Sequence, residues 1–168
     1  DALRRRVYLA LMEEQRMLRR IERARCRVQH GDDVHLVRST TPAYDAATPE
    51  VSVILTLYNY CDVVVETLDS IVASRDVDIE VVVIDDHSRD AGRAIVQAFM
   101  DDHPRVPMIL VGSEVNRGLP VSRNEAIVIA RADRVMVMDA DNAVYPNCLH
   151  VLSDALDEHP DAAFAYAT

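Results

Sequence analysis

The sequence predicts an α/β fold built on a doubly wound, mostly parallel sheet. Three observations support this prediction: short apolar runs recur from residue 51 onward, longer runs between them carry apolar residues every three or four positions, and the two kinds of run alternate strictly. Strands buried on both faces of a parallel sheet are continuous apolar runs, whereas a helix with one buried face shows the three-to-four spacing. Strict alternation therefore indicates strand-helix-strand units with right-handed crossovers.

Five short segments have the composition of buried strands, and four longer ones have helical spacing. The predicted strands are residues 51–57, 79–84, 107–111, 134–139 and 162–167. The predicted helices are residues 61–74, 89–102, 118–131 and 145–159. Residues 51–168 are thus expected to form one Rossmann-like subdomain, whose ligands would bind at the carboxyl ends of the strands.

The first fifty residues differ in kind from the rest of the chain. Residues 1–28 have nearly heptad apolar spacing, interrupted by Glu14, which predicts an amphipathic helical extension. This helix could pack on its own domain, form a weak coiled-coil dimer, or lie on a membrane surface, because residues 1–30 hold nine Arg and only four acidic residues. Residues 29–50 contain two Pro and no clear period, which predicts a linker.

The composition excludes several classes of protein. A formal net charge of −10 argues against a nucleic-acid partner, which would require a basic face. The chain has no Lys and four Gly, which excludes a P-loop and a glycine-rich dinucleotide fingerprint. Three scattered Cys are typical of reduced thiols, and no apolar run is long enough for a transmembrane segment. We therefore expect a cytoplasmic protein, with peripheral attachment to the inner face of the membrane left open.

Polar residues follow each of the first four predicted strands. These clusters are residues 56–59, 85–88, 116–118 and 139–142. Each cluster alone could be a turn or a helix cap. Because the carboxyl ends of parallel strands share one edge of the sheet, the four clusters together predict a ligand site.

Four stretches carry a resemblance to a known family: VSVILTLYN, VVVIDDHSRD, NRGLPVSRNEAI and VMVMDADNAVYPNCL. In order and spacing they resemble the motifs of family 2 glycosyltransferases with the GT-A fold. The resemblance implies that residues 51–168 are the donor-binding, N-terminal half of a catalytic domain, truncated before the acceptor half. It implies transfer of a sugar from a nucleotide-diphosphate sugar, UDP-sugar favoured, to a hydroxyl acceptor on a glycan, with inversion.

The resemblance also implies a metal site at Asp139 and Asp141. In this family an Asp-x-Asp pair holds a divalent cation against the diphosphate, with Asp141 as the direct ligand and Asp139 contacting the ribose or metal-bound water. Hard oxygen ligands suit Mn²⁺ or Mg²⁺. An EF-hand is a rival interpretation, but Val144 stands where that loop needs glycine.

Further donor-binding residues follow from the same resemblance. Asp86 matches the carboxylate that accepts a hydrogen bond from the base, and uracil N3–H is a suitable donor. Arg123 would neutralise diphosphate oxygens. His87 stands where the family commonly has glycine. The implied donor site contains Thr56, Tyr58, Asn59, Asp86, Gly118, Arg123, Asn124 and Asp139.

The catalytic base of inverting members belongs to the acceptor half. The acidic residues after the Asp-x-Asp pair match no such motif, so we expect the base beyond Thr168 and no catalysis by this chain alone. Two alternatives stay open. A receiver-type phosphoacceptor domain needs a lysine, which the chain lacks. A catalytically inactive transferase-like module, which binds a nucleotide or a partner, would be distinguished by its response to metal.

Overall fold

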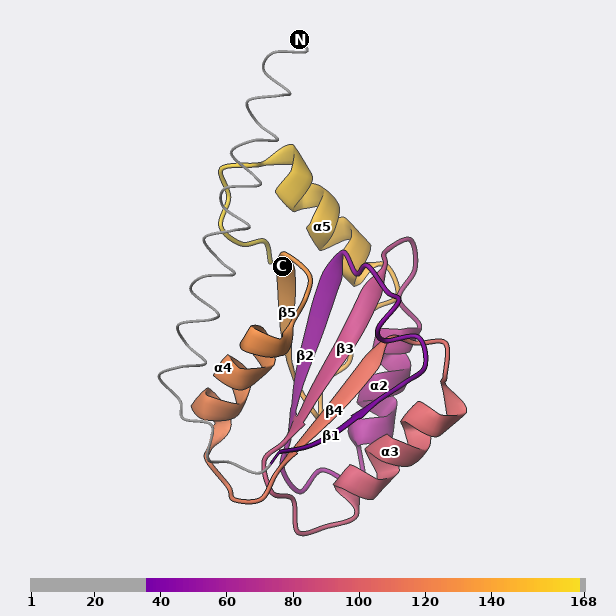
Figure 1. Ribbon diagram of the computed structural model, residues 1–168. Coiled ribbons are helices and arrows are strands. Elements are labelled where there is room, and N and C mark those ends of the chain that lie inside the picture. The colour runs from indigo at the N-terminus through magenta and orange to yellow at the C-terminus, as the bar shows by residue number, and fades with distance from the viewer. Residues whose placement is uncertain (1–35, 167–168) are drawn as a thin grey trace. The chain divides into compact units, whose positions relative to one another are not determined.

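A computed structural model describes residues 36–166, which contain one five-stranded sheet in the order β1-β4-β3-β2-β5 (Figure 1). The strands are β1 (Leu36–Thr40), β2 (Val51–Leu57), β3 (Ile79–Asp85), β4 (Met108–Ser113) and β5 (Arg134–Asp139). The helices are α2 (Val64–Val72), α3 (Gly92–Asp102), α4 (Leu119–Ile129) and α5 (Cys148–Glu158). The helical extension and the dimer expected from residues 1–28 lie outside the described residues.

The strand order confirms the doubly wound α/β fold. β2, β3, β4 and β5 are mutually parallel, and β1 pairs antiparallel with β4. From β2 the sheet grows outward through β3 to β4, and the chain then crosses back to place β5 on the other side of β2. The order of the strands therefore reverses between β2 and β5, and such a switch point is where ligands bind in open α/β sheets.

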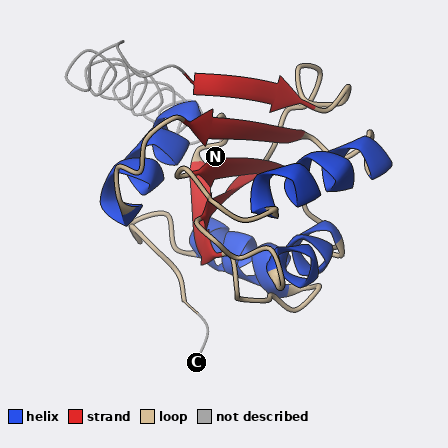
Figure 2. Ribbon diagram, turned by 90° about the horizontal axis from the view of Figure 1, so that it is seen from below, coloured by secondary structure: helices blue, strands red, loops and turns tan. Residues whose placement is uncertain are grey.

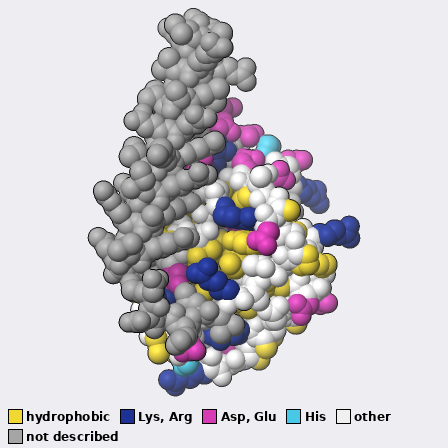
Figure 3. Space-filling view, viewed as in Figure 1, with side chains coloured by type: hydrophobic (Ala, Val, Ile, Leu, Met, Phe, Trp, Pro, Cys, Tyr) yellow, Lys and Arg dark blue, Asp and Glu magenta, His cyan; other side chains and the backbone are white. Residues whose placement is uncertain are grey.

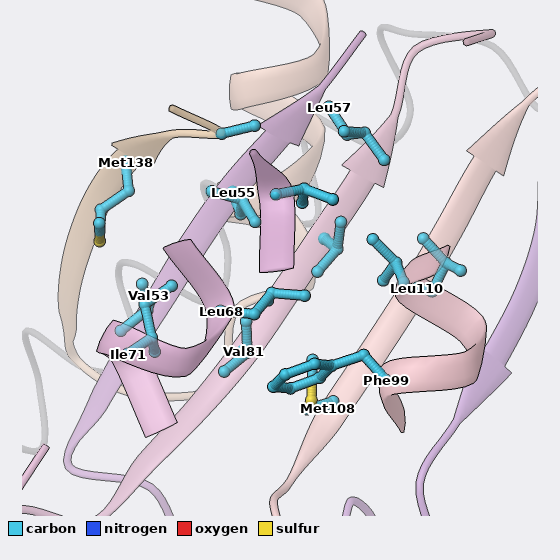
Figure 4. Close-up of a cluster of buried hydrophobic side chains, with 14 of the residues drawn as sticks. Val53, Leu55, Leu57, Leu68, Ile71, Val81, Phe99, Met108, Leu110 and Met138 are labelled. Carbon is cyan, nitrogen blue, oxygen red and sulfur yellow. The ribbon is translucent and has the colours of Figure 1, made fainter. Parts of the chain in front are cut away.

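Helices cover both faces of the sheet (Figure 2). Because successive side chains of a strand point to opposite faces, β2 contributes to two cores. Val53 and Leu55 pack with α2 and α3, in a cluster that includes Leu68 and Phe99 (Figure 4). Ile54 belongs to the second cluster, on the α4 side of the sheet. The long apolar runs of the central strands are thus explained by burial on both faces.

Two of the sequence-based expectations are wrong. Residues 36–40, expected within a linker, form β1, which pairs with β4. Just after β1, Thr41 Oγ1 accepts a hydrogen bond from the Met108 N–H at 3.0 Å, which adds a further contact with β4. An edge strand has only one neighbour and needs no continuous apolar run, so periodicity gave no signal. Residues 162–166, expected as the larger part of a strand, form no strand, and Phe164 and Tyr166 are exposed. Their composition suits a strand, but they have no strand neighbour to supply backbone hydrogen bonds.

The surface carries both signs of charge. On the face shown in Figure 3, acidic and basic side chains are interspersed among hydrophobic ones. Within residues 36–166, no helix is both long and apolar enough to span a lipid bilayer.

Candidate functional site

The ends of three parallel strands meet at one edge of the sheet. In the β2–β5 register Thr56 lies opposite Asp139, and in the β2–β3 register Leu57 lies opposite Asp85. The Asp86 N–H donates to the Leu57 carbonyl at 2.9 Å, which keeps the two chains together just past the strands. The polar clusters after β2, β3 and β5 therefore converge as predicted.

Asp86 joins the remaining polar cluster, residues 116–118, to this edge. Its buried carboxylate accepts hydrogen bonds from the Arg117 N–H at 2.8 Å and the Gly118 N–H at 2.7 Å. Gly118 has φ of 84°, a conformation that favours glycine, and α4 begins at the next residue. Asp86 therefore anchors the loop between β4 and α4, a role that the sequence did not reveal because its partners are backbone groups.

Arg123 and Asp139 form an ion pair across the site. Arg123 Nη2 lies 2.5 Å from Asp139 Oδ1, and the two side chains are 34% and 46% exposed. A pair this exposed contributes only about 0–1 kcal/mol, so it opens easily. Asp141 is exposed and makes no hydrogen bond or ion pair with the residues that the structure describes. Of the two carboxylates predicted to act together, only Asp139 has a partner among the residues that the structure describes.

Unpaired polar atoms gather around the start of α4. Five buried side-chain atoms of the described residues have no hydrogen-bond partner: Ser74 Oγ, which follows α2, and Thr56 Oγ1, Arg117 Nε, Ser122 Oγ and Arg123 Nε. Three of these atoms belong to α4 or the loop before it, and Thr56 lies at the end of β2, against which α4 packs. Buried polar groups are normally paired, so this concentration indicates a place where a polar ligand supplies the missing partners. Thr56 and Arg123 were among the expected donor-site residues, and Arg117 lay in the polar cluster 116–118, whereas Ser122 was not predicted.

The loops after β2 and β3 are fastened to each other. Asn59 Oδ1 accepts a hydrogen bond from the Arg89 N–H at 2.8 Å, and the Asn59 N–H donates to Ser88 Oγ at 3.1 Å. The Asp90 carboxylate accepts the N–H groups of Cys61 and Gly92. Partial burial alone would raise the pKa of Asp90, but these N–H groups outweigh it and lower the pKa. Both loops are therefore held in one conformation beside the site.

The remaining predicted residues lie at this edge with different surroundings. Tyr58 is exposed just past β2, and Asn124 is exposed on α4. Asp85, from the polar cluster 85–88, is buried and pairs with Arg93 at 2.6 Å. The structure thus gives Asp85 a fixed internal partner, while Tyr58 and Asn124 stay accessible.

His87 adopts the backbone conformation that glycine would favour, with φ of 65°. We predict that His87→Val lowers the free energy of unfolding by about 1–2 kcal/mol, because a β-branched residue is strained at positive φ. His87→Gly should cost less than about 0.5 kcal/mol, because relief of strain offsets the added freedom of the unfolded chain. Chemical denaturation measures both values, and equal losses would contradict this explanation.

Comparison with known proteins identifies the family and agrees with the fold. Residues 52–168 match the family described as glycosyl transferase family 2. The succinoglycan biosynthesis protein ExoO of Rhizobium meliloti is 38% identical over 116 residues, which cover 69% of this chain and 32% of that protein. Chondroitin synthase of Escherichia coli is 28% identical over 120 residues, or 71% of this chain and 17% of that protein. The chain therefore spans a third or less of the length of these relatives.

Solved structures of glycosyltransferases share the fold. S. aureus TarS in complex with UDP-GlcNAc superimposes with a TM-score of 0.61 at 29% identity, covering 66% of this chain and 32% of TarS. The mannosyltransferase PcManGT of Pyrobaculum calidifontis, in complex with GDP-Man and Mn²⁺, gives a TM-score of 0.61 at 26% identity, covering 88% of this chain and 42% of that chain. The family match and the common GT-A fold lead to one conclusion: this chain belongs to glycosyl transferase family 2.

Proposed function

We propose that the edge formed by the ends of β2, β3 and β5 binds a nucleotide-diphosphate sugar, UDP-sugar favoured, as the donor for transfer to a hydroxyl acceptor on a glycan. The observation that carries the proposal is the ion pair of Arg123 and Asp139 beside the unpaired polar atoms at the start of α4. A guanidinium, free hydroxyls and a nearby pair of carboxylates suit a diphosphate with its cation. The nucleotide sugars bound by TarS and PcManGT support the same class of ligand.

The residues present fit a divalent cation that is held jointly with the ligand. Asp139 and Asp141 supply hard oxygen atoms, which Mn²⁺ and Mg²⁺ prefer. Within residues 36–166, no three acidic, His or Cys side chains gather closely enough to hold a metal by themselves. The remaining ligands would therefore be water and phosphate oxygens. When bound, the cation would neutralise the charge of the departing nucleotide diphosphate.

The chain's own residues have distinct tasks in this proposal. Arg123 binds diphosphate oxygens, and Gly118, without a side chain, admits the ligand close to the backbone. Asp86 accepts a hydrogen bond from the base, since each of its oxygens keeps a second lone pair after accepting a loop N–H. The exposed ring of Tyr58 stacks on the base. Thr56, Asn59 and Asn124 complete the wall of the donor site.

In this proposal the catalytic base lies beyond Thr168. On α5, Asp154 is paired with His150 and Asp157 with Arg134, so both acids have structural partners. We therefore assign neither as the base that deprotonates the acceptor hydroxyl. A carboxylate beyond Thr168 would perform that step, the transfer would invert the anomeric carbon, and residues 1–168 alone would bind the donor without transferring its sugar.

Base selectivity tests this proposal. In the presence of Mn²⁺, the chain should bind UDP or GDP more tightly than CDP or ADP by about tenfold, because Asp86 can accept from a ring N–H and uncharged cytosine N3 has none to donate. Asp86→Asn keeps the size of the side chain but offers an amide donor, so it should abolish the preference of UDP over CDP. Isothermal titration calorimetry gives these affinities, with thermal melts as a check that the loop anchored by residue 86 stays folded. Equal binding of UDP and CDP by the unaltered chain would remove Asp86 from base recognition.

A further inference from the structure

We infer that Arg123 is an internal counter-ion that changes partner: it holds Asp139 while the site is empty and releases it to the cation when a diphosphate binds. This inference deepens the proposed function and rests on it. It means that the nucleotide binds before the metal or together with it. It also assigns to Arg123 a second role besides neutralising phosphate.

The first observation is the unequal state of the two carboxylates. Asp139 lies 2.5 Å from the Arg123 guanidinium, whereas Asp141 is exposed and has no partner among the residues described. A cation that arrives alone would meet one open carboxylate and one that is already neutralised. It would also approach the positive charge of Arg123, which opposes binding. Metal without nucleotide should therefore bind weakly.

The second observation is that Asp139 does not satisfy the guanidinium. Arg123 Nε is buried without a hydrogen-bond partner, while Nη2 bonds to the carboxylate. A guanidinium has five N–H donors in a planar fork, which matches phosphate oxygens in bidentate geometry. A diphosphate offers more oxygens and more negative charge than one carboxylate. Arg123 should consequently prefer the diphosphate and leave Asp139.

The third observation is how readily the pair can open. Both side chains are at least a third exposed, so water can replace either partner. The backbone positions need not move, because α4 and β5 both pack on β2. The change therefore requires only a rotation of the Arg123 side chain. This is a local switch with two discrete partners.

Mn²⁺ binding in the absence of nucleotide tests the inference. Free Mn²⁺ is measured by electron paramagnetic resonance during titration of the 168-residue chain. We expect Arg123→Gln to raise Mn²⁺ affinity by about tenfold, because Asp139 becomes available and a positive charge is lost. Arg89→Gln is the matched control: it removes an exposed positive charge from the loop after β3, and it should change the affinity by less than about twofold.

The same variants must also respond to nucleotide. UDP should increase the Mn²⁺ affinity of the unaltered chain, and it should increase that of Arg123→Gln by a smaller factor, since the release of Asp139 no longer contributes. If Arg123→Gln does not fold, Arg123→Met keeps an uncharged stem of similar length and gives the same comparison.

Mn²⁺ binding by Arg123→Gln that is unchanged or weaker than in the unaltered chain would overturn the inference. If UDP still promotes Mn²⁺ binding in the unaltered chain, the donor site stands and only the exchange of partners fails. If UDP has no effect on Mn²⁺ in any of the proteins, the proposed function fails and the inference fails with it.

Discussion

Replacing Glu80 with alanine is expected to lower the free energy of unfolding by about 3–5 kcal/mol. The Glu80 side chain is completely buried in β3. Its carboxylate accepts hydrogen bonds at 2.6 Å from Ser52 Oγ, from the Arg131 N–H and from Arg131 Nε. Alanine would leave these donors without their acceptor inside the protein. The loss is large because a buried group without its partner keeps its full cost of desolvation.

This network also determines where the site residues lie. Arg131 follows α4 and precedes β5, and its guanidinium lies 4.0 Å from the centre of the Tyr44 ring. Glu80 thus fixes the connection between the helix that carries Arg123 and the strand that ends at Asp139. The pKa of Tyr44 is raised, mainly by burial of its side chain and to a smaller extent by the negative charge of Glu80.

Urea denaturation measures the loss, and a surface acid supplies the control. Asp154 on α5 is 60% exposed in its pair with His150, so Asp154→Ala should cost less than about 0.5 kcal/mol. A cost below about 1 kcal/mol for Glu80→Ala would show that water satisfies the abandoned donors, and would contradict the structural role of the network.

Asp141→Asn is expected to remove most of the dependence of nucleotide binding on metal. The substitution keeps the shape of the side chain but replaces a charged ligand with a neutral one, so affinity for Mn²⁺ in the presence of UDP should fall by about 10- to 100-fold. Stability without metal should be unchanged or slightly higher, because Asp141 has no partner within residues 36–166 and repels Asp139.

A matched substitution distinguishes the loss of a metal ligand from the loss of a negative charge. Glu114 is an exposed acid just after β4, and Glu114→Gln removes the same charge outside the Asp-x-Asp pair. Mn²⁺ affinity in the presence of UDP should change by less than about twofold in this control. Equal losses in the two variants would attribute the effect to overall charge rather than to coordination.

The sequence predicted the layers of the fold because its central strands are buried on both faces. Runs such as residues 51–57 and 79–84 have one physical explanation, a sheet covered by helices on both sides. β1 escaped prediction because an edge strand is stabilised by one neighbour and leaves no apolar run. The prediction of a strand at residues 162–167 was wrong for the opposite reason: residues 162–166 have the apolar composition of a strand but no neighbouring strand to pair with.

The meeting of the polar clusters at one edge was predictable, and the contacts among them were not. Four polar clusters at strand ends had to meet once the sheet was parallel. The anchoring of the loop by Asp86 was invisible, because its donors are the N–H groups of Arg117 and Gly118, and backbone groups are not specified by residue type. The pair of Arg123 with Asp139 joins a helix to a strand, so it depends on packing that no local pattern encodes.

Calorimetric titration of UDP into the chain, with and without Mn²⁺, tests the central claim most directly. If the ends of β2, β3 and β5 form a donor site, Mn²⁺ should tighten UDP binding by at least about tenfold in the unaltered chain and by less than about twofold in Asp141→Asn. UDP binding of equal strength in both proteins, with and without metal, would contradict the account. It would mean that the paired carboxylates only cap the end of β5.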